Sequence, residues 1–160
     1  MPTIEISIPE QTLRLLDERG DVVRTYSVST ARNGPGEQSG SFCTPRGWHV
    51  VRARIGDGQP VNTVFVRRRP TGEVWSPELA TKHPGRDWIL TRILWLSGLE
   101  PGFNRLGNVD TMRRFIYIHG SSDTAVMGEP GSIGCVRMRN EDVIDLFDRV
   151  PVGTLVNIRD

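Results

Sequence analysis

The chain has 160 residues, which is enough for one ordinary domain. Hydrophobic residues make up 37% and charged residues 24%, a mix that is typical of folded proteins and argues against general disorder. The formal net charge of +1 favours neither nucleic acid nor a membrane surface, and no apolar run is long enough to span a bilayer.

Short β-rich runs follow one another along the chain. Ile4, Ile6 and Ile8 alternate with polar residues, which is the period of a half-buried strand. The run Arg67-Arg68-Arg69 is predicted to be the solvated end of a strand, with a phosphate or carboxylate contact as the alternative. Similar runs predict further strands at 12–16, 22–30, 48–54, 61–67, 88–96, 115–118 and 154–158.

One helix is predicted near the C-terminus. Asn140 has the side chain of an N-cap, and Val143 and Phe147 fall on one helical face. Pro151 follows the expected end of this helix. We therefore predict a mainly β single domain over residues 1–160, built as a β-sandwich or a partly closed barrel with one or two short helices.

Two residues of the C-terminal half could form a nucleophile and its base. His119 follows a predicted strand, and Cys135 comes after a long loop that can fold back and bring the two side chains together. An imidazole can take the proton of a thiol and later protonate a leaving amine. Backbone N–H groups of Gly134 and Cys135 could then stabilise an oxyanion. The plainer interpretation is that Cys135 is a small buried hydrophobe and His119 a packed histidine.

The cysteines and histidines give no sign of a metal site. Two cysteines and three scattered histidines lack the spacing of zinc ligands, and two cysteines do not make a disulfide framework. We therefore expect no metal and no cofactor.

The sequence around Cys135 resembles the catalytic domain of the L,D-transpeptidase family, the YkuD-type fold. The shared pattern is His119-Gly120, followed by Ser132-Ile133-Gly134-Cys135-Val136-Arg137-Met138. Tyr26-Ser27-Val28-Ser29-Thr30 and Thr44-Pro45-Arg46-Gly47 also fit, whereas residues 56–112 match weakly. Many members have a histidine directly before the Gly-Cys pair. Ile133 occupies that position here, which removes a role for a second histidine.

This resemblance implies a mechanism and its residues. Cys135 is expected to attack the carbonyl at the L-centre of meso-diaminopimelate in a peptidoglycan tetrapeptide stem, with His119 as the base. D-alanine then leaves, and a thioester acyl-enzyme remains. The carbonyl of Gly120 is expected to orient His119, and Ser132 and Gly134 are expected to shape the cysteine turn.

Other residues are weaker candidates. Arg137 is expected to hold the loop or a substrate carboxylate. Tyr117 and Arg92 are possible substrate contacts, since strand residues two apart share a face. Cys43 is predicted to be structural, with an oxidisable thiol as the alternative. His49 is predicted to be a satisfied or surface histidine.

The acceptor of the acyl group decides between two enzymatic functions. Water is the default acceptor unless an amine is held in position, which favours an L,D-carboxypeptidase that trims muropeptides during wall recycling. An L,D-transpeptidase that forms 3,3 cross-links or exchanges D-amino acids is the alternative. A non-catalytic domain that binds peptidoglycan fragments is a third hypothesis, from another class.

The N-terminus gives an expectation about the compartment. The residues after Met1 show no basic leader and no apolar signal-peptide core. If Met1 is the natural start, we expect a cytoplasmic protein. If an export signal has been removed, the periplasm or cell wall is expected.

Overall fold

One large β-sheet dominates the computed structural model, which describes residues 1–160. Its strands run in the order β4-β10-β1-β2-β3-β9-β8-β7-β5-β6. They are β1 (Thr3–Ser7), β2 (Thr12–Leu16), β3 (Val22–Ser29), β4 (Gly47–Ile55), β5 (Thr63–Val66), β6 (Arg69–Val74), β7 (Leu90–Gly98), β8 (Tyr117–Gly120), β9 (Val136–Met138) and β10 (Leu155–Arg159). Two α-helices accompany them, α1 (Pro77–Lys82) and α2 (Asn140–Arg149). A short 3-10 helix covers Gly107–Val109.

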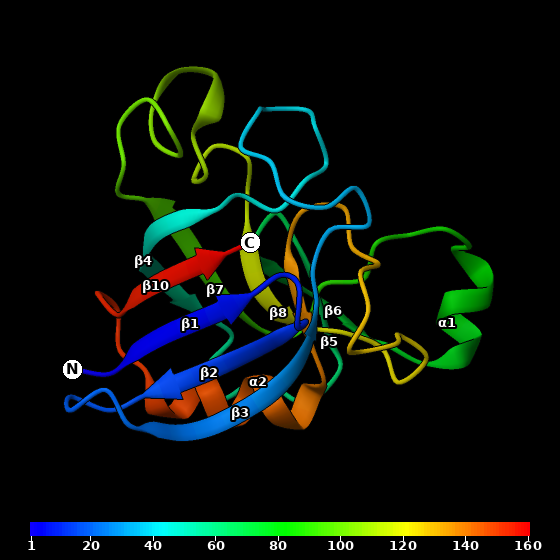
Figure 1. The fold of residues 1–160 in the computed structure, drawn as a ribbon. Helices are drawn as coiled ribbons and strands as arrows, with labels where there is room; N and C mark the ends of the chain where they lie inside the picture. The colour runs from blue at the N-terminus through cyan, green and yellow to red at the C-terminus, as the bar shows by residue number, and fades with distance from the viewer.

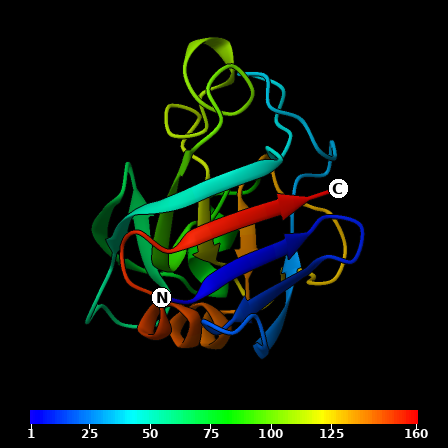
Figure 2. The ribbon, with the colours of Figure 1, turned by 60° about the vertical axis from the view of Figure 1, so that its left-hand side comes forward.

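The sheet closes on itself because β4 pairs with β7 as well as with β10. This pairing joins the two ends of the run from β4 to β7 and makes a barrel, with the β5–β6 hairpin attached outside it. Figure 2 shows β4, β10, β1 and β2 side by side on one wall of this barrel. The predicted mainly β fold is confirmed, and of its two alternative architectures the structure has the barrel. Closure depends on pairing between strands far apart in sequence, which the local pattern does not report.

Alternation of residues along the strands fills the barrel interior. Ile4 and Ile6 are fully buried in the main core, while their neighbours on β1 are partly exposed. The same period places Ile118 of β8 and Val136 of β9 in that core. Side chains that flank them on these strands, such as Tyr117, therefore point to the outer face of the barrel. This outer face carries a second apolar cluster, which includes Cys135.

Helix α2 covers one end of the barrel. Figures 1 and 2 show it lying across the lower end of the strands, and Val143, Leu146 and Phe147 reach into the main core. The predicted helix is confirmed, but the prediction that Asn140 is its N-cap is wrong. Arg139 holds the cap position without a side-chain hydrogen bond, and Asn140 is the first helical residue, with its side chain turned into the protein.

The middle of the chain differs most from the sequence-based prediction. Strand β6 begins with residues 69–72, where Pro70 and Gly72 are turn signals, and neither α1 nor the short strand β9 lies in a run for which the sequence predicted that element. In Figure 1, α1 extends from the body of the protein beside the β5–β6 hairpin. Neither helix is both long and apolar enough to cross a membrane.

Candidate active site

A tight turn before β9 presents Cys135. The Ser132 hydroxyl donates to the carbonyl of Cys135 at 2.6 Å and accepts from the N–H of Gly134 at 3.2 Å. Gly134 has a φ of +136°, and a Cβ there would lie 3.2 Å from Ile116 Cδ1. The position therefore favours glycine for both conformation and space. The expected part of Ser132 and Gly134 in shaping this turn agrees with these contacts.

The loop over residues 33–44 supports the same turn from the other side. The hydroxyl of Thr44 donates to the Gly134 carbonyl at 2.8 Å. Arg114 donates to the carbonyls of Gly36 and Cys43 at 3.2 and 2.6 Å, which ties the loop to the segment before β8. Cys43 itself is partly buried, and its Sγ lies 3.6 Å from the Ser41 carbonyl.

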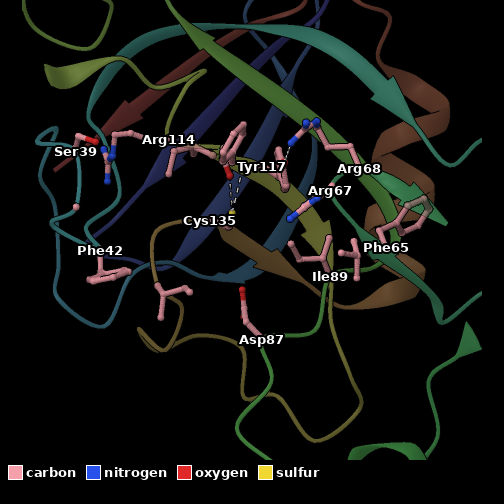
Figure 3. Close-up of a pocket in the computed structure, with 15 residues that line it drawn as sticks. Ser39, Phe42, Phe65, Arg67, Arg68, Asp87, Ile89, Arg114, Tyr117 and Cys135 are labelled. Carbon is pink, nitrogen blue, oxygen red and sulfur yellow. Dashed lines mark hydrogen bonds between the residues drawn. The ribbon is translucent and has the colours of Figure 1, made fainter. Parts of the chain in front are cut away.

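The thiol of Cys135 faces a cavity of about 540 Å³ (Figure 3). Its Sγ accepts a hydrogen bond from the N–H of Tyr117 at 3.3 Å and donates to the carbonyl of Phe115 at 3.4 Å. Cys135 is only 9% exposed. Burial raises its pKa to about 12, against smaller opposing effects of the Tyr117 N–H and of nearby arginines. The resting side chain is therefore a neutral thiol.

His119 is fully buried on the neighbouring strand. Strands β8 and β9 are parallel with His119 opposite Arg137, so the imidazole and Cys135 lie on the same outer face as diagonal neighbours. Nδ1 donates to the Gly120 carbonyl at 2.6 Å, which is the orienting contact expected from the sequence. Because a carbonyl only accepts, Nδ1 carries the proton and Nε2 has the free lone pair.

The Nε2 atom of His119 is buried and has no hydrogen-bond partner. Burial lowers the pKa of His119, while Asp87 and the Gly120 carbonyl act in the opposite direction. The imidazole is therefore neutral at pH 7 and able to accept a proton. The same face of the sheet therefore carries a neutral thiol and a neutral imidazole whose basic nitrogen has no hydrogen-bond partner.

A buried polar network of Thr91, Asn140 and Asn62 packs against Gly120. Asn140 accepts a hydrogen bond from the Thr91 hydroxyl at 2.7 Å and donates to Asn62 at 2.7 Å. A Cβ on Gly120 would overlap Asn140 Oδ1, so the two residues are in direct contact. Thr91 has a φ of +74°, a strained conformation for a β-branched residue. Such strain persists only where the surroundings enforce it, which marks this network as a rigid support for the His119–Gly120 pair.

These groups are of the kinds that cysteine acyl transfer requires, and comparison with known proteins identifies the family of the chain. Residues 1–158 match the family model of the L,D-transpeptidase catalytic domain. The chain belongs to this family. One relative is the L,D-transpeptidase YkuD of Bacillus licheniformis, to which the chain is 46% identical over 155 residues; the match covers 97% of this chain and 64% of that protein. It is 33% identical to YbiS of Escherichia coli over 126 residues, covering 72% of this chain and 40% of YbiS.

A solved structure supports the fold assignment. L,D-transpeptidase 3 from Mycobacterium tuberculosis, in complex with a faropenem-derived adduct, superimposes with a TM-score of 0.60 at 15% identity, covering 99% of this chain and 60% of that chain. At this identity the likeness concerns the fold alone. The chain spans well under two thirds of the length of YbiS, so the activity of the whole relative does not transfer automatically.

The remaining residues predicted for this L,D-transpeptidase domain fall in different places. Tyr117 lines the cavity. Arg137 is beside it and is engaged with protein groups, donating to the Gly131 carbonyl at 3.1 Å and to Asp87 at 2.8 Å. Arg137 thus holds the loop, as one of its two expected roles required. Arg92 does not line the cavity, because its guanidinium donates to the carbonyl of Gln59 and lies over the ring of Phe147.

Another expectation is not met in the resting structure. The N–H of Gly134, predicted as an oxyanion donor, already donates to Ser132 Oγ. It would have to exchange this partner before it could bind a developing oxyanion.

Sequence reasoning missed the cavity residues that come from the middle of the chain. Arg67, Arg68 and Asp87 line the cavity with Arg114 and the loop residue Phe42. The basic run was the only signal for the two arginines; a solvated strand end was predicted for it, with a phosphate or carboxylate contact as the alternative. Its place beside Cys135 depends on how the β5–β6 hairpin folds over β7 and β8.

Proposed function

We propose that this L,D-transpeptidase-family protein is a cysteine-dependent L,D-carboxypeptidase. Its substrates would be peptidoglycan tetrapeptides that contain meso-diaminopimelate, from which it removes the terminal D-alanine. The observation that carries the proposal is a cavity-facing thiol, Cys135, on the same face of the sheet as a buried His119 whose Nε2 has no hydrogen-bond partner. Membership of the family supports the peptide substrate.

The geometry supports a two-step reaction. Nε2 of His119 takes the proton of Cys135 as the sulfur attacks the carbonyl at the L-centre of diaminopimelate. The Gly120 carbonyl, which accepts from Nδ1, stabilises the resulting imidazolium and keeps the ring oriented. The imidazolium then protonates the amine of D-alanine, which leaves a thioester. Water, deprotonated by the same nitrogen, adds to the thioester carbonyl, and the sulfur recovers its proton.

The charges around the cavity favour water over an amine as the acceptor. Arg67, Arg68 and Arg114 line the cavity, and none of them forms an ion pair. Its one carboxylate, Asp87, is bound by Arg137. A cationic amine would enter against this positive field, whereas water would not.

A second candidate is an L,D-transpeptidase that forms 3,3 cross-links or exchanges D-amino acids. Its support is the family itself and the thioester, which both reactions share. The two functions also differ in compartment. Hydrolysis of free muropeptides belongs to the cytoplasm, and cross-linking belongs to the cell wall, so fractionation of cells that express the full-length protein tests this part of the proposal.

Product analysis separates the two activities. The protein is incubated with a disaccharide tetrapeptide, with and without a D-amino acid, and the products are identified by mass. Tripeptide alone in both reactions supports hydrolysis. A cross-linked dimer or an exchanged tetrapeptide would replace the carboxypeptidase proposal with the transpeptidase one. The Cys135→Ala protein serves as the control for contaminating activity.

A non-catalytic domain that binds peptidoglycan fragments is the third candidate. Treatment of the folded protein with a carbapenem or a thiol reagent distinguishes it from an enzyme. An adduct on Cys135 of the Cys43→Ser variant, located by mass spectrometry, supports the acyl-enzyme mechanism. Absence of this adduct, together with absence of any product, would support the binding function instead.

A further inference from the structure

The turn of the β5–β6 hairpin has an unusual sequence for its conformation. Arg67 and Arg68 form the two-residue turn between Val66 and Arg69, which pair with each other. Their φ angles are +52° and +66°. Two-residue hairpin turns with both φ angles positive favour Asn-Gly, because a Cβ disfavours the left-handed region, glycine has none, and the short polar side chain of asparagine tolerates this conformation. Two arginines at these positions reduce the stability of the turn, so folding alone does not account for them.

Both arginines enter the cavity that Cys135 lines. Figure 3 shows their side chains on one side of the thiol, opposite Arg114 and the loop that carries Phe42. The hairpin turn thus brings two positive charges into the cavity that Cys135 lines.

The guanidinium of Arg68 is held in one place. It donates to the hydroxyl of Tyr117 at 2.9 Å and lies over the rings of Trp95 and Phe115, 4.6 and 4.8 Å from their centroids. The hydrogen bond to Tyr117 uses one of the five N–H donors of Arg68, and the two rings hold the plane of the guanidinium. The remaining donors are free for a ligand, and their orientation is fixed before the ligand binds.

The third cavity arginine is used differently. Arg114 donates to the carbonyls of Gly36 and Cys43, so its hydrogen bonds go to the loop that it supports. Arg67 makes no hydrogen bond or ion pair within the protein and is exposed. The turn therefore presents two guanidiniums with unused donors next to the reactive thiol.

We propose that Arg67 and Arg68 form a carboxylate-binding subsite that selects the acyl donor. The donor is a peptide with a free carboxylate close to the attacked carbonyl, and the planar fork of Arg68 suits a carboxylate. This inference rests on the proposed function. The carboxylate has two possible sources, the C-terminus of the leaving D-alanine and the end of the diaminopimelate side chain.

The test replaces the turn without unfolding it. The double variant Arg67→Asn/Arg68→Gly has the preferred residues for this turn, which offset the lost contacts of Arg68 with Tyr117 and the two aromatic rings, so the variant should stay folded with a melting temperature close to that of the wild type. Three tetrapeptide donors are compared: one with both carboxylates free, one with the side-chain carboxylate amidated, and one with the C-terminus amidated. Arg19→Gln, which removes an exposed charge from the turn between β2 and β3, is the matched control.

The expected result is a change in KM with little change in kcat. For the wild type and Arg19→Gln, one of the amidated donors should have a KM about tenfold or more above that of the free donor, because a charged hydrogen bond is lost. That donor identifies the carboxylate source. The double variant should show the higher KM for all three donors. Raising the salt concentration should weaken the preference of the wild type and of Arg19→Gln, and should leave the double variant without a preference.

Two results would overturn the subsite: equal KM values for all donors with the wild type, or unchanged discrimination by the double variant. A uniform loss of kcat with a lower melting temperature would instead show a structural role. If the wild type turns over no donor, the proposed function has failed. The subsite is then tested by calorimetric binding of the three donors to Cys135→Ala, in which equal dissociation constants would refute it.

Discussion

Replacing Asn140 by alanine tests whether the network behind Gly120 positions the base. The substitution removes the acceptor of the Thr91 hydroxyl and the donor to Asn62, both at 2.7 Å. Thr91 is fully buried, so its hydroxyl loses a partner that water does not readily replace. The unsatisfied buried hydroxyl of Thr91 costs about 1–3 kcal/mol and the lost bond to the partly exposed Asn62 about 1 kcal/mol, which together give roughly 2–4 kcal/mol of lost stability. A domain of ordinary stability remains folded after such a loss.

The functional effect follows from the contact between Asn140 and Gly120. With the amide gone, Gly120 loses its contact with Asn140 Oδ1, so its backbone can shift together with the ring of His119 that its carbonyl holds. Misplacement of a catalytic group by about 1 Å can reduce the rate about 100-fold, so we expect kcat to fall by roughly 10- to 100-fold while KM changes little.

Urea unfolding and steady-state kinetics on tetrapeptide check both parts. Thr91→Ser is the conservative control, because it keeps the hydroxyl and removes the β-branched methyl that is strained at positive φ. This control should retain both rate and stability. An Asn140→Ala protein that loses stability but keeps the wild-type kcat would refute the positioning role and leave the network a purely structural one.

Three further predictions concern the titrating residues. Cys135→Ala should show no turnover and an unfolding free energy within about 1 kcal/mol of the wild type by urea titration, since the two side chains are similar in size; wild-type activity in this variant would refute the thioester mechanism. The acid limb of the pH profile of kcat/KM should lie below pH 6.5, because burial lowers the pKa of His119 in the free enzyme. A limb at or above pH 6.5 would contradict His119 as the base. His49 is buried with Nε2 bonded to Thr111 at 3.1 Å, and burial lowers its pKa from 6.5 to about 4. As the pH falls, the imidazole of His49 therefore becomes protonated in the unfolded chain before it does in the folded protein. The contribution of neutral His49 to the free energy of unfolding is thus complete above pH 6.5 and is lost as the pH falls through 4. Between pH 7 and pH 4, this effect should lower the free energy of unfolding of the wild type by about 3 kcal/mol more than that of His49→Gln, as measured by urea titrations at the two pH values.

Many of the strands and the helix α2 could be predicted from the sequence, because local patterns of apolar and polar residues determine them. The alternation of Ile4 and Ile6 gave β1 correctly, and the apolar face with Val143 and Phe147 gave α2. Strand β6 was missed because Pro70 and Gly72 are strong turn signals. Pairing with β5 overrode them, since a hairpin edge tolerates proline.

The candidate site divides in the same way. His119, Gly120, Ser132 and Cys135 belong to one contiguous stretch of sequence, so a motif could identify them. Arg68, by contrast, comes from the weakly matching middle, and Asn140 was interpreted as a helix cap. Their roles depend on contacts with residues far away in the chain, such as Tyr117 and Thr91.

The sequence by itself determined that this chain is a mainly β member of the L,D-transpeptidase family, and it predicted Cys135 and His119 as the reactive pair. Period-two alternation and a short motif carry that information, and both are local. Only the tertiary structure decided that the sheet closes into a barrel, that the thiol of Cys135 is buried and neutral, and that two arginines with positive φ angles line the same cavity. Burial and charge proximity arise when distant segments meet, and no local pattern encodes them.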